Sequence, residues 1–270
     1  SSDRGVPFAR CAEVLDSPGL QWRGWHMASP SAADIPAYRR MVDTLALLKY
    51  NTIVWEVDGN LKYETHPDIG RDTAPTKAEL KALVDYAKSR HFRVIPQLAV
   101  FSHFDYVLRL PAYQHLAETA QTVKGIRSRF NSCPRHPETF PLVFDLMGEL
   151  QEVFEPDVFH VGLDESSYDD IGLCDRCKTS QPWEIWAESI CKLHEWVKGH
   201  GMRMAIWGDQ FLEEHTGAEP HFTAKATDMV PKDILIFDWH YGPNHRYDRT
   251  IGYFKEHGFE VIGCPWYEPA

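Results

Sequence analysis

The sequence predicts an α/β protein of the (β/α)8 TIM-barrel type, in which seven strands can be identified and the eighth is not found. Segments with strand and helix character alternate along the chain, and the strands are almost continuously apolar, as in parallel sheets buried on both faces. No glycine-rich GxGxxG turn follows the first strand, which disfavours a dinucleotide-binding doubly wound sheet. The chain stops at PWYEPA. We therefore expect either a fragment or a barrel that closes in another way.

The first half of the chain supplies three strands and two helices. The first strand alternates apolar and polar residues and ends in a Ser-Pro-Ser turn, and the second is rich in β-branched and aromatic residues. Each helix carries apolar residues at helical spacing. The predicted strands are 20–28, 52–57 and 93–100, and the predicted helices are 36–48 and 76–90. A long connection follows the third strand.

The second half continues the alternation. Predicted helices cover 138–153, 183–200 and 247–257, and predicted strands cover 159–163, 202–207, 234–239 and 259–264. No repeat, low-complexity linker or internal boundary interrupts this pattern. We expect residues 1–19 to form an irregular N-terminal segment and residues 20–270 to form one barrel catalytic domain.

The composition limits the classes of function. The 270 residues are 43% hydrophobic and 13% aromatic, which suits one large domain with a substantial core. A net charge of -11 argues against nucleic acid or an anionic membrane as the main partner. No apolar run approaches the length of a membrane helix, and the N-terminus lacks the apolar centre of a signal peptide. We expect a cytoplasmic protein, although a removed leader would leave no trace, and we expect no cofactor.

The stretch FHVGLDE, residues 159–165, is the most informative part of the sequence. Three apolar residues alternate within it, which predicts a short buried strand that delivers Asp164 and Glu165 to its carboxyl end. Parallel α/β folds place their chemistry there. Two adjacent acids after a buried strand cost desolvation free energy, which favours a catalytic role. The structural alternative is that Asp164 caps the next helix while Glu165 is a solvated acid of its first turn.

The other strand ends carry acids, histidines and aromatic rings. Tryptophan faces can stack on a sugar ring, while acids and histidines bond to its hydroxyl groups, so this set predicts a carbohydrate site. Arg23, within the apolar first strand, needs a carboxylate or a polar ligand to offset its burial. The expected substrate-binding residues are Arg23, Glu56, Asp58, His103, Trp207, Asp209, Trp239, Tyr241, Trp266 and Tyr267.

Glycoside cleavage commonly uses two carboxyl groups on opposite sides of the scissile bond. Neighbouring residues of an extended strand point to opposite faces, so Asp164 and Glu165 are poorly placed to form that pair. Different roles for the two acids fit better. Glu165 would be the acid, and Asp164 would orient a group of the substrate, which itself attacks the anomeric carbon. The 2-acetamido group of an N-acetylhexosamine can do this by closing to an oxazolinium ion.

The sequence resembles glycoside hydrolase family 20, the β-N-acetylhexosaminidases, and especially their hexosaminidase D-like branch. The family signature is His-x-Gly-Gly-Asp-Glu, and this chain has HVGLDE at 160–165, with Leu163 replacing the second glycine. WRGWHM resembles the family's first strand with its sugar-binding arginine, Arg23. The segment that begins at YAKSRHFRVIPQ resembles the third strand and its loop, with His103 as the active-site histidine. Gln97 stands where most members have an acid, as it does in the hexosaminidase D-like branch.

The resemblance implies an exo-acting hydrolase that removes terminal β-linked N-acetylhexosamine through an oxazolinium intermediate. Its partner would be an N-acetylhexosamine-terminated glycan or glycoconjugate, with Asp164 and Glu165 catalytic. It also implies that Trp207, Trp239 and Trp266 enclose the acetamido group and ring, and that Tyr241 or Tyr267 holds the acetamido oxygen. The family's eighth-strand tryptophan and acid are missing from this chain. Two alternatives stay open: a two-carboxylate retaining glycosidase of another barrel family, and a non-catalytic sugar-binding barrel.

The six cysteines do not form a recognised framework. Cys174 and Cys177 make a lone CxxC without a second pair, which is weak evidence for zinc. We expect a loop-stabilising thiol pair or disulfide there, rather than a metal site. His160 is expected to be a packed histidine behind the site.

Overall fold

The computed structural model describes residues 13, 16–119, 131–166, 171–241 and 246–266. Its seven strands form one parallel sheet in the order β1-β2-β3-β4-β5-β6-β7. The strands are β1 Gly24–Ala28, β2 Thr52–Glu56, β3 Arg93–Gln97, β4 Val158–His160, β5 Arg203–Trp207, β6 Leu235–Tyr241 and β7 Glu260–Trp266. Each strand is paired only with its neighbours in sequence, and β7 does not pair with β1 among the described residues. The predicted barrel with seven strands and no eighth is confirmed as a curled, open half-barrel.

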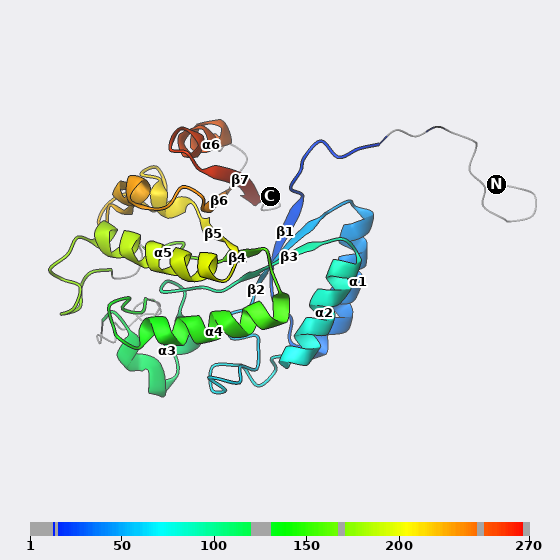
Figure 1. Ribbon diagram of the computed structural model, residues 1–270, viewed down its shortest axis with the longest axis horizontal. Helices are drawn as coiled ribbons and strands as arrows, with labels where there is room; N and C mark the ends of the chain where they lie inside the picture. Colours follow the sequence, from blue (N-terminus) through cyan, green and yellow to red (C-terminus); the bar gives the residue numbers. More distant parts are fainter. Residues whose placement is uncertain (1–12, 14–15, 120–130, 167–170, 242–245, 267–270) are drawn as a thin grey trace, which may run out of the picture.

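Helices cover the convex side of the curled sheet (Figure 1). They are α1 Ile35–Leu47, α2 Lys77–Ser89, α3 Asp105–Leu108, α4 Thr139–Phe154, α5 Pro182–Gly199 and α6 Tyr247–Glu256. Five of these agree with the predicted helices to within a residue or two, and the short α3 lies in the long connection after β3. Between β5 and β6 the chain forms 3-10 turns at Asp209–Phe211 and Thr223–Met229 in place of an α-helix. None of the described helices combines the length and apolar character needed to cross a bilayer.

Local sequence signals explain where the helices begin. Thr76 caps α2 by accepting a hydrogen bond from the backbone N–H of Glu79, whose side chain bonds back to the Thr76 backbone. The same reciprocal arrangement joins Gln181 and Glu184 at the start of α5, with Pro182 in the first turn. These caps satisfy amide groups that the first helical turn leaves without intrahelical partners.

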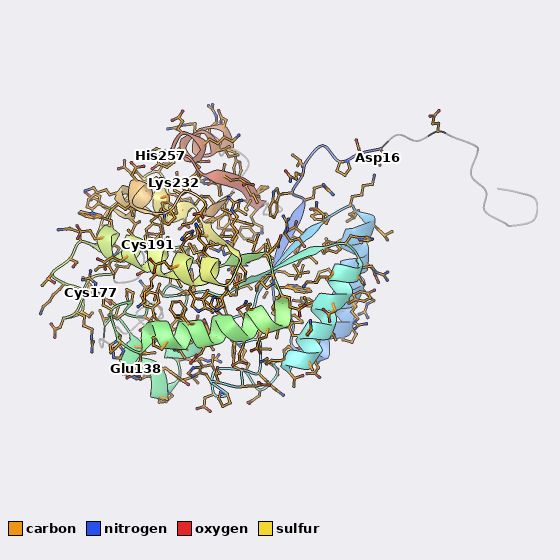
Figure 2. The ribbon with its side chains drawn as sticks, viewed as in Figure 1. Asp16, Glu138, Cys177, Cys191, Lys232 and His257 are labelled. Atoms are coloured by element: carbon orange, nitrogen blue, oxygen red, sulfur yellow. The ribbon has the colours of Figure 1, made fainter. Side chains whose placement is uncertain are left out.

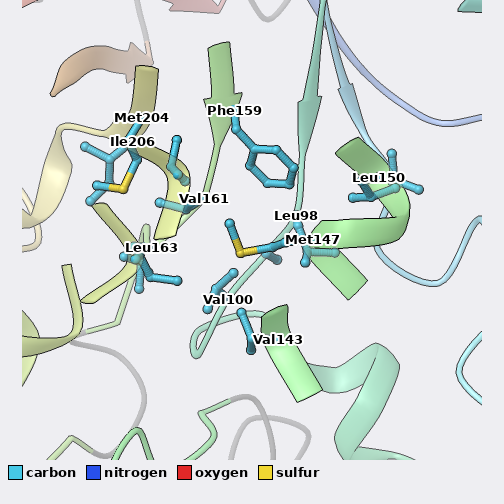
Figure 3. Close-up of a cluster of buried hydrophobic side chains, with 14 of the residues drawn as sticks. Leu98, Val100, Val143, Met147, Leu150, Phe159, Val161, Leu163, Met204 and Ile206 are labelled. Atoms are coloured by element: carbon cyan, nitrogen blue, oxygen red, sulfur yellow. The ribbon is translucent and has the colours of Figure 1, made fainter. Parts of the chain in front are cut away.

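Alternate residues of the strands pack into two separate apolar layers. One layer lies between the sheet and the helices, and Figure 3 shows part of it, with Phe159 of β4 beside Met147 and Leu150 of α4. The other lies on the concave side of the sheet and consists of Val54, Ile95, Val158, Ala205, Trp207, Leu235 and Phe237. Because most residues of β2 to β6 are buried on both faces of the sheet, these strands are almost continuous apolar runs, whereas the edge strands β1 and β7 are largely exposed or half-buried.

Strand β4 is shorter than the sequence predicted. It ends at His160, and the predicted continuation to Leu163 is wrong because Gly162 and Leu163 have φ angles of +66° and +67°. The turn stays attached to β5, since Val161 N donates to Ala205 O (2.9 Å) and Trp207 N donates to Gly162 O (3.2 Å). The two acids therefore follow a tight turn, and strand alternation does not send them to opposite faces.

The turn after β4 should be sensitive to any side chain at position 162. A Cβ atom on Gly162 would lie 3.2 Å from Ala99 Cα, in a backbone region that non-glycine residues occupy at a cost. We expect Gly162→Ala to lower the free energy of unfolding by about 1–3 kcal/mol in urea titrations. Gly148→Ala, in α4, is the control, because a Cβ there meets nothing within 4 Å. Gly148→Ala should raise the free energy of unfolding by about 0.5–1 kcal/mol. Equal effects of the two substitutions would contradict this account.

Candidate active site

The centre of the site is His103, which lies between the two acids of the HVGLDE motif. Its Nε2 atom is 3.5 Å from Asp164 Oδ2 and 3.3 Å from Glu165 Oε2. Hydrogen bonds and the charges of Asp164 and Glu165 outweigh partial burial and raise the pKa of His103 to about 11. At neutral pH the imidazole of His103 is therefore a cation beside the two acids.

Asp209 supports this group from behind. It follows β5, its side chain is fully buried, and its Oδ2 atom accepts hydrogen bonds from the Glu165 backbone N–H (2.9 Å) and the Thr216 hydroxyl. Its Oδ1 atom accepts a hydrogen bond from Trp239 Nε1 at 3.2 Å. Burial, followed by the negative charge of Asp164, raises the pKa of Asp209 to about 7 despite these donors. Asp209 thus fixes both the backbone of Glu165 and the ring of Trp239.

Glu56 and Asp58 form a second acidic pair beside His103. Glu56 Oε2 lies 3.3 Å from His26 Nε2 and accepts a hydrogen bond from Gln97 Nε2 at 3.4 Å. Burial opposes the ionisation of Glu56, but the hydrogen bonds to His26 and Asp58 and the charges of His26 and His103 together outweigh burial and lower the pKa of Glu56. Burial, with the charge of Glu56, instead raises the pKa of Asp58 well above its ordinary value. Asp58 Oδ1 also accepts the Ala99 backbone N–H at 2.9 Å. Asp58 therefore holds its proton more strongly than Glu56 does.

Three of the predicted aromatic residues form a continuous row along the ends of β6 and β7. The Trp239 and Tyr241 ring centroids are 4.7 Å apart, and the Tyr241 and Trp266 centroids are 4.6 Å apart. Tyr241 is 60% exposed and Trp266 is 52% exposed, so both rings are accessible to a ligand. Burial and the charges of Glu165 and Asp164 raise the pKa of Tyr241, so the row borders the acids.

Trp207 has a different environment from the other tryptophans. It is only 7% exposed, and it packs with the apolar residues on the concave side of the sheet. Its ring centroid lies 4.6 Å from that of His160 and 5.2 Å from that of His26. Trp207 therefore belongs to the concave apolar layer and offers little surface to a ligand. His160 is fully buried and accepts the Gly162 N–H at 3.1 Å, as expected for a packed histidine behind the site.

The structure does not place Arg23 with the other predicted site residues. Arg23 precedes β1, and its backbone N–H donates to Asn51 Oδ1 where β2 begins, at the opposite end of the strands from the acids. Its guanidinium donates to the carbonyl oxygens of Lys49 (2.6 Å) and Leu20 (2.5 Å). Carbonyl groups, rather than the expected carboxylate or ligand, offset its charge. Tyr267 lies outside the described residues.

Residues that the sequence analysis did not assign to the site also contribute. Thr216 donates to Asp209, and His215 packs its ring against Trp239 at a centroid distance of 4.3 Å. Burial, followed by the charge of His240, lowers the pKa of His215 to about 4. Both residues lie between the 3-10 turns after β5, where no periodic pattern marks them. His26 pairs with Glu56, and this contact depends on the register of β1 and β2.

Comparison with known proteins agrees with the fold and with the sequence motif. Residues 21–267 match the catalytic domain of glycosyl hydrolase family 20. Beta-hexosaminidase subunit A1 of Dictyostelium discoideum is 27% identical over 170 residues, covering 57% of this chain and 31% of that protein. Hexosaminidase D of Bos taurus is 29% identical over 136 residues, covering 49% and 36%.

A solved structure has the same architecture. The family 20 exo beta-N-acetylglucosaminidase from Vibrio harveyi, in complex with N-acetylglucosamine, superposes with a TM-score of 0.71 at 18% identity, over 93% of this chain and 42% of that one. The chain thus spans less than half the length of each of these three relatives. The match to the family covers nearly the whole chain and includes every residue of the acid and histidine cluster. The chain belongs to glycosyl hydrolase family 20, whose catalytic domain it carries.

Proposed function

We propose that this protein is an exo-acting β-N-acetylhexosaminidase that removes terminal β-linked N-acetylglucosamine or N-acetylgalactosamine from glycans or glycoconjugates. The observation that carries the proposal is the position of His103, within 3.5 Å of both Asp164 and Glu165 in a family 20 domain. The names of the relatives support it, since they include beta-hexosaminidases and an exo beta-N-acetylglucosaminidase in complex with N-acetylglucosamine.

The first chemical step uses the substrate's own nucleophile. Protonated Glu165 donates its proton to the glycosidic oxygen, and the bond between that oxygen and the anomeric carbon breaks. The acetamido carbonyl oxygen forms a bond to the anomeric carbon, which gives an oxazolinium ion. Asp164 stays ionised beside the acetamido nitrogen, where its charge stabilises the positive charge that develops.

The second step returns the enzyme to its starting state. Glu165, now a carboxylate, accepts a proton from a water molecule whose oxygen attacks the anomeric carbon. The carbon–oxygen bond of the oxazolinium ring breaks, and the acetamido group is restored. Because both steps invert the anomeric carbon, the product keeps the β configuration. Asp209, which holds the Glu165 backbone, keeps the acid in one position through both steps.

The aromatic row provides a surface for the sugar. Tyr241 and Trp266 expose their rings beside the acids, and Trp239 is fixed through its hydrogen bond to Asp209. Apolar faces of a pyranose ring stack on such rings, while Glu56 and Asp58 can bond to hydroxyl groups. We assign substrate binding to these residues.

A comparison of substrates tests this proposal. We expect hydrolysis of aryl 2-acetamido-2-deoxy-β-glycosides and no measurable hydrolysis of the matching 2-hydroxy glycosides, because the hydroxyl group cannot form an oxazolinium ion. A thiazoline analogue of the intermediate should inhibit competitively. Equal turnover of both glycoside types would instead favour a two-carboxylate mechanism, and binding of N-acetylglucosamine without turnover would favour a sugar-binding protein.

The effects of substituting the two acids should depend differently on the leaving group of the substrate. With a poor leaving group, Glu165→Gln should lower kcat/KM by roughly 10²–10⁴-fold, because protonation is lost, whereas an activated aryl glycoside should be affected far less. Asp164→Asn should lower kcat/KM on both substrates, since the oxazolinium charge develops in both. Glu155→Gln, directly after α4, is the matched control and should leave kcat/KM unchanged on both substrates. Equal losses across leaving groups for Glu165→Gln would contradict its role as the acid.

The raised pKa of His103 predicts a pH-dependent contribution to stability. Its pKa is about 11 in the folded protein and about 6.5 when unfolded. The stabilisation is therefore fully present below about pH 6.5 and is lost as the pH rises towards 11. We expect the difference in unfolding free energy between wild type and His103→Gln to shrink between pH 6 and pH 10, measured by urea titration.

A second pair of proteins provides the control for this effect. In the Asp164→Asn, Glu165→Gln background the two acids no longer raise the pKa of His103. Adding His103→Gln to that background should change the unfolding free energy by an amount that varies little with pH. A pH-dependent difference of the same size in both backgrounds would show that the stabilisation comes from elsewhere.

A further inference from the structure

Three cysteines and one glutamate come together in the loops beside the site. Cys133 Sγ lies 3.4 Å from Cys174 Sγ and 3.6 Å from Cys177 Sγ, and none of the three is in a disulfide. With Glu118 they place four ligand atoms within 4.8 Å of one another. Glu118, Cys133 and Cys177 are buried and Cys174 is half-buried. Such a group has the donor types and compactness of a metal site.

The sulfur positions suit a tetrahedral ion. With a zinc–sulfur bond of about 2.3 Å, tetrahedral angles separate neighbouring sulfurs by about 3.8 Å. The two observed distances are close to that value. Cys174 and Cys177 lie in one tight turn, because the backbone N–H groups of Cys177 and Lys178 both donate to Cys174 O at 2.9 Å. This turn directs two sulfurs of a CxxC towards the same point.

Glu118 provides independent evidence that this cluster binds a cation. It is 3% exposed, and its Oε1 atom accepts backbone N–H groups from Gly172 (3.0 Å) and Cys174 (3.1 Å). Its Oε2 atom is buried and has no hydrogen-bond partner among the described residues. A buried carboxylate oxygen without a partner is costly unless something compensates it. The bonds to Oε1 resemble the outer-shell bonds that orient a metal-binding carboxylate.

The geometry points to a structural zinc site formed by Cys133, Cys174, Cys177 and Glu118. Thiolates select soft or borderline ions, and three sulfurs with one carboxylate oxygen in a compact group suit zinc rather than magnesium or calcium. Four protein ligands leave no open position, which is typical of structural rather than catalytic zinc. Arg135, two residues after Cys133, offsets part of the negative charge of the cluster.

This inference differs from the sequence-based expectation of a loop-stabilising thiol pair or disulfide. Cys133 is 41 residues from Cys174, so the third sulfur was not recognisable from spacing. Figure 2 shows Cys177 at the edge of the molecule where α4 and α5 begin, whereas Cys191 lies within α5.

The zinc site would join the two loops that carry the acids and the histidine. Next to Cys133, Ser132 N donates to Phe101 O at 2.9 Å, two residues before His103. Asn131 Nδ2 donates to Ser166 O at 3.3 Å, directly after Glu165. A metal bound by Cys133 from one loop and by Cys174 and Cys177 from the other would therefore fix the separation of His103 from its two acids.

Metal analysis of the purified, untagged protein tests the inference. Grown with zinc, the wild-type protein should contain equimolar zinc by inductively coupled plasma mass spectrometry. Cys133→Ser and Cys177→Ser should lose most of it, and Glu118→Gln should weaken zinc binding by roughly tenfold or more in a chelator competition. Cys191→Ser and Cys264→Ser, matched substitutions outside the cluster, should keep it. This measurement does not depend on whether the protein hydrolyses any glycoside.

A second measurement uses only the wild-type protein, so it tests the inference even if the variants fail to fold. Replacing zinc by cobalt should give intense thiolate-to-cobalt charge-transfer absorption and the visible bands of tetrahedral cobalt. The three thiols should react with iodoacetamide only after chelation.

Three results would overturn the inference. The first is wild-type protein without zinc after growth and reconstitution with it. The second is a disulfide within the cluster found by mass spectrometry without reduction. The third is zinc that is kept in Cys133→Ser but lost in His136→Ala, which would assign the metal to the more exposed His115, His136 and Glu138 group.

Discussion

The imidazolium of His103 is the interaction on which the site depends. Asp164 and Glu165 are adjacent in sequence, and the buried Asp209 accepts a hydrogen bond from the Glu165 backbone N–H. Three carboxyl groups this close repel one another when ionised, and burial makes that repulsion stronger. A cation within 3.5 Å of two of them makes the arrangement tolerable. The same charges raise the pKa of His103, so the cation persists across the physiological pH range.

The backbone around this interaction is held in uncommon conformations. Leu163, Glu165, Phe101 and His103 all have positive φ angles, which cost free energy in residues other than glycine. Leu163 stands where the family motif has glycine, and its buried side chain packs in the apolar layer beneath the helices. We infer that this packing compensates for the conformation of Leu163. The strain lies in the two loops that carry the acids and the histidine.

Most of the α/β architecture followed from the sequence. Apolar runs and helical periodicity gave seven strands and five of the helices, because burial on both faces of a parallel sheet leaves a strong local signal. The errors fell where that signal was weak. The strand at 159–163 was overextended because its apolar alternation continues through a turn, and the 3-10 segments after β5 lack any periodicity.

The sequence by itself determined the fold class, the order of strands and helices and the adjacent acids, since each of these depends on residues close together in the chain. Only the tertiary structure decided which strand-end residues meet. It placed Arg23 at the far end of the strands, put Thr216 and His215 behind Asp209 and Trp239, and joined Cys133 to the CxxC turn. The physical reason is that strand register and loop conformation set these contacts, and both arise from packing between segments that are distant in sequence.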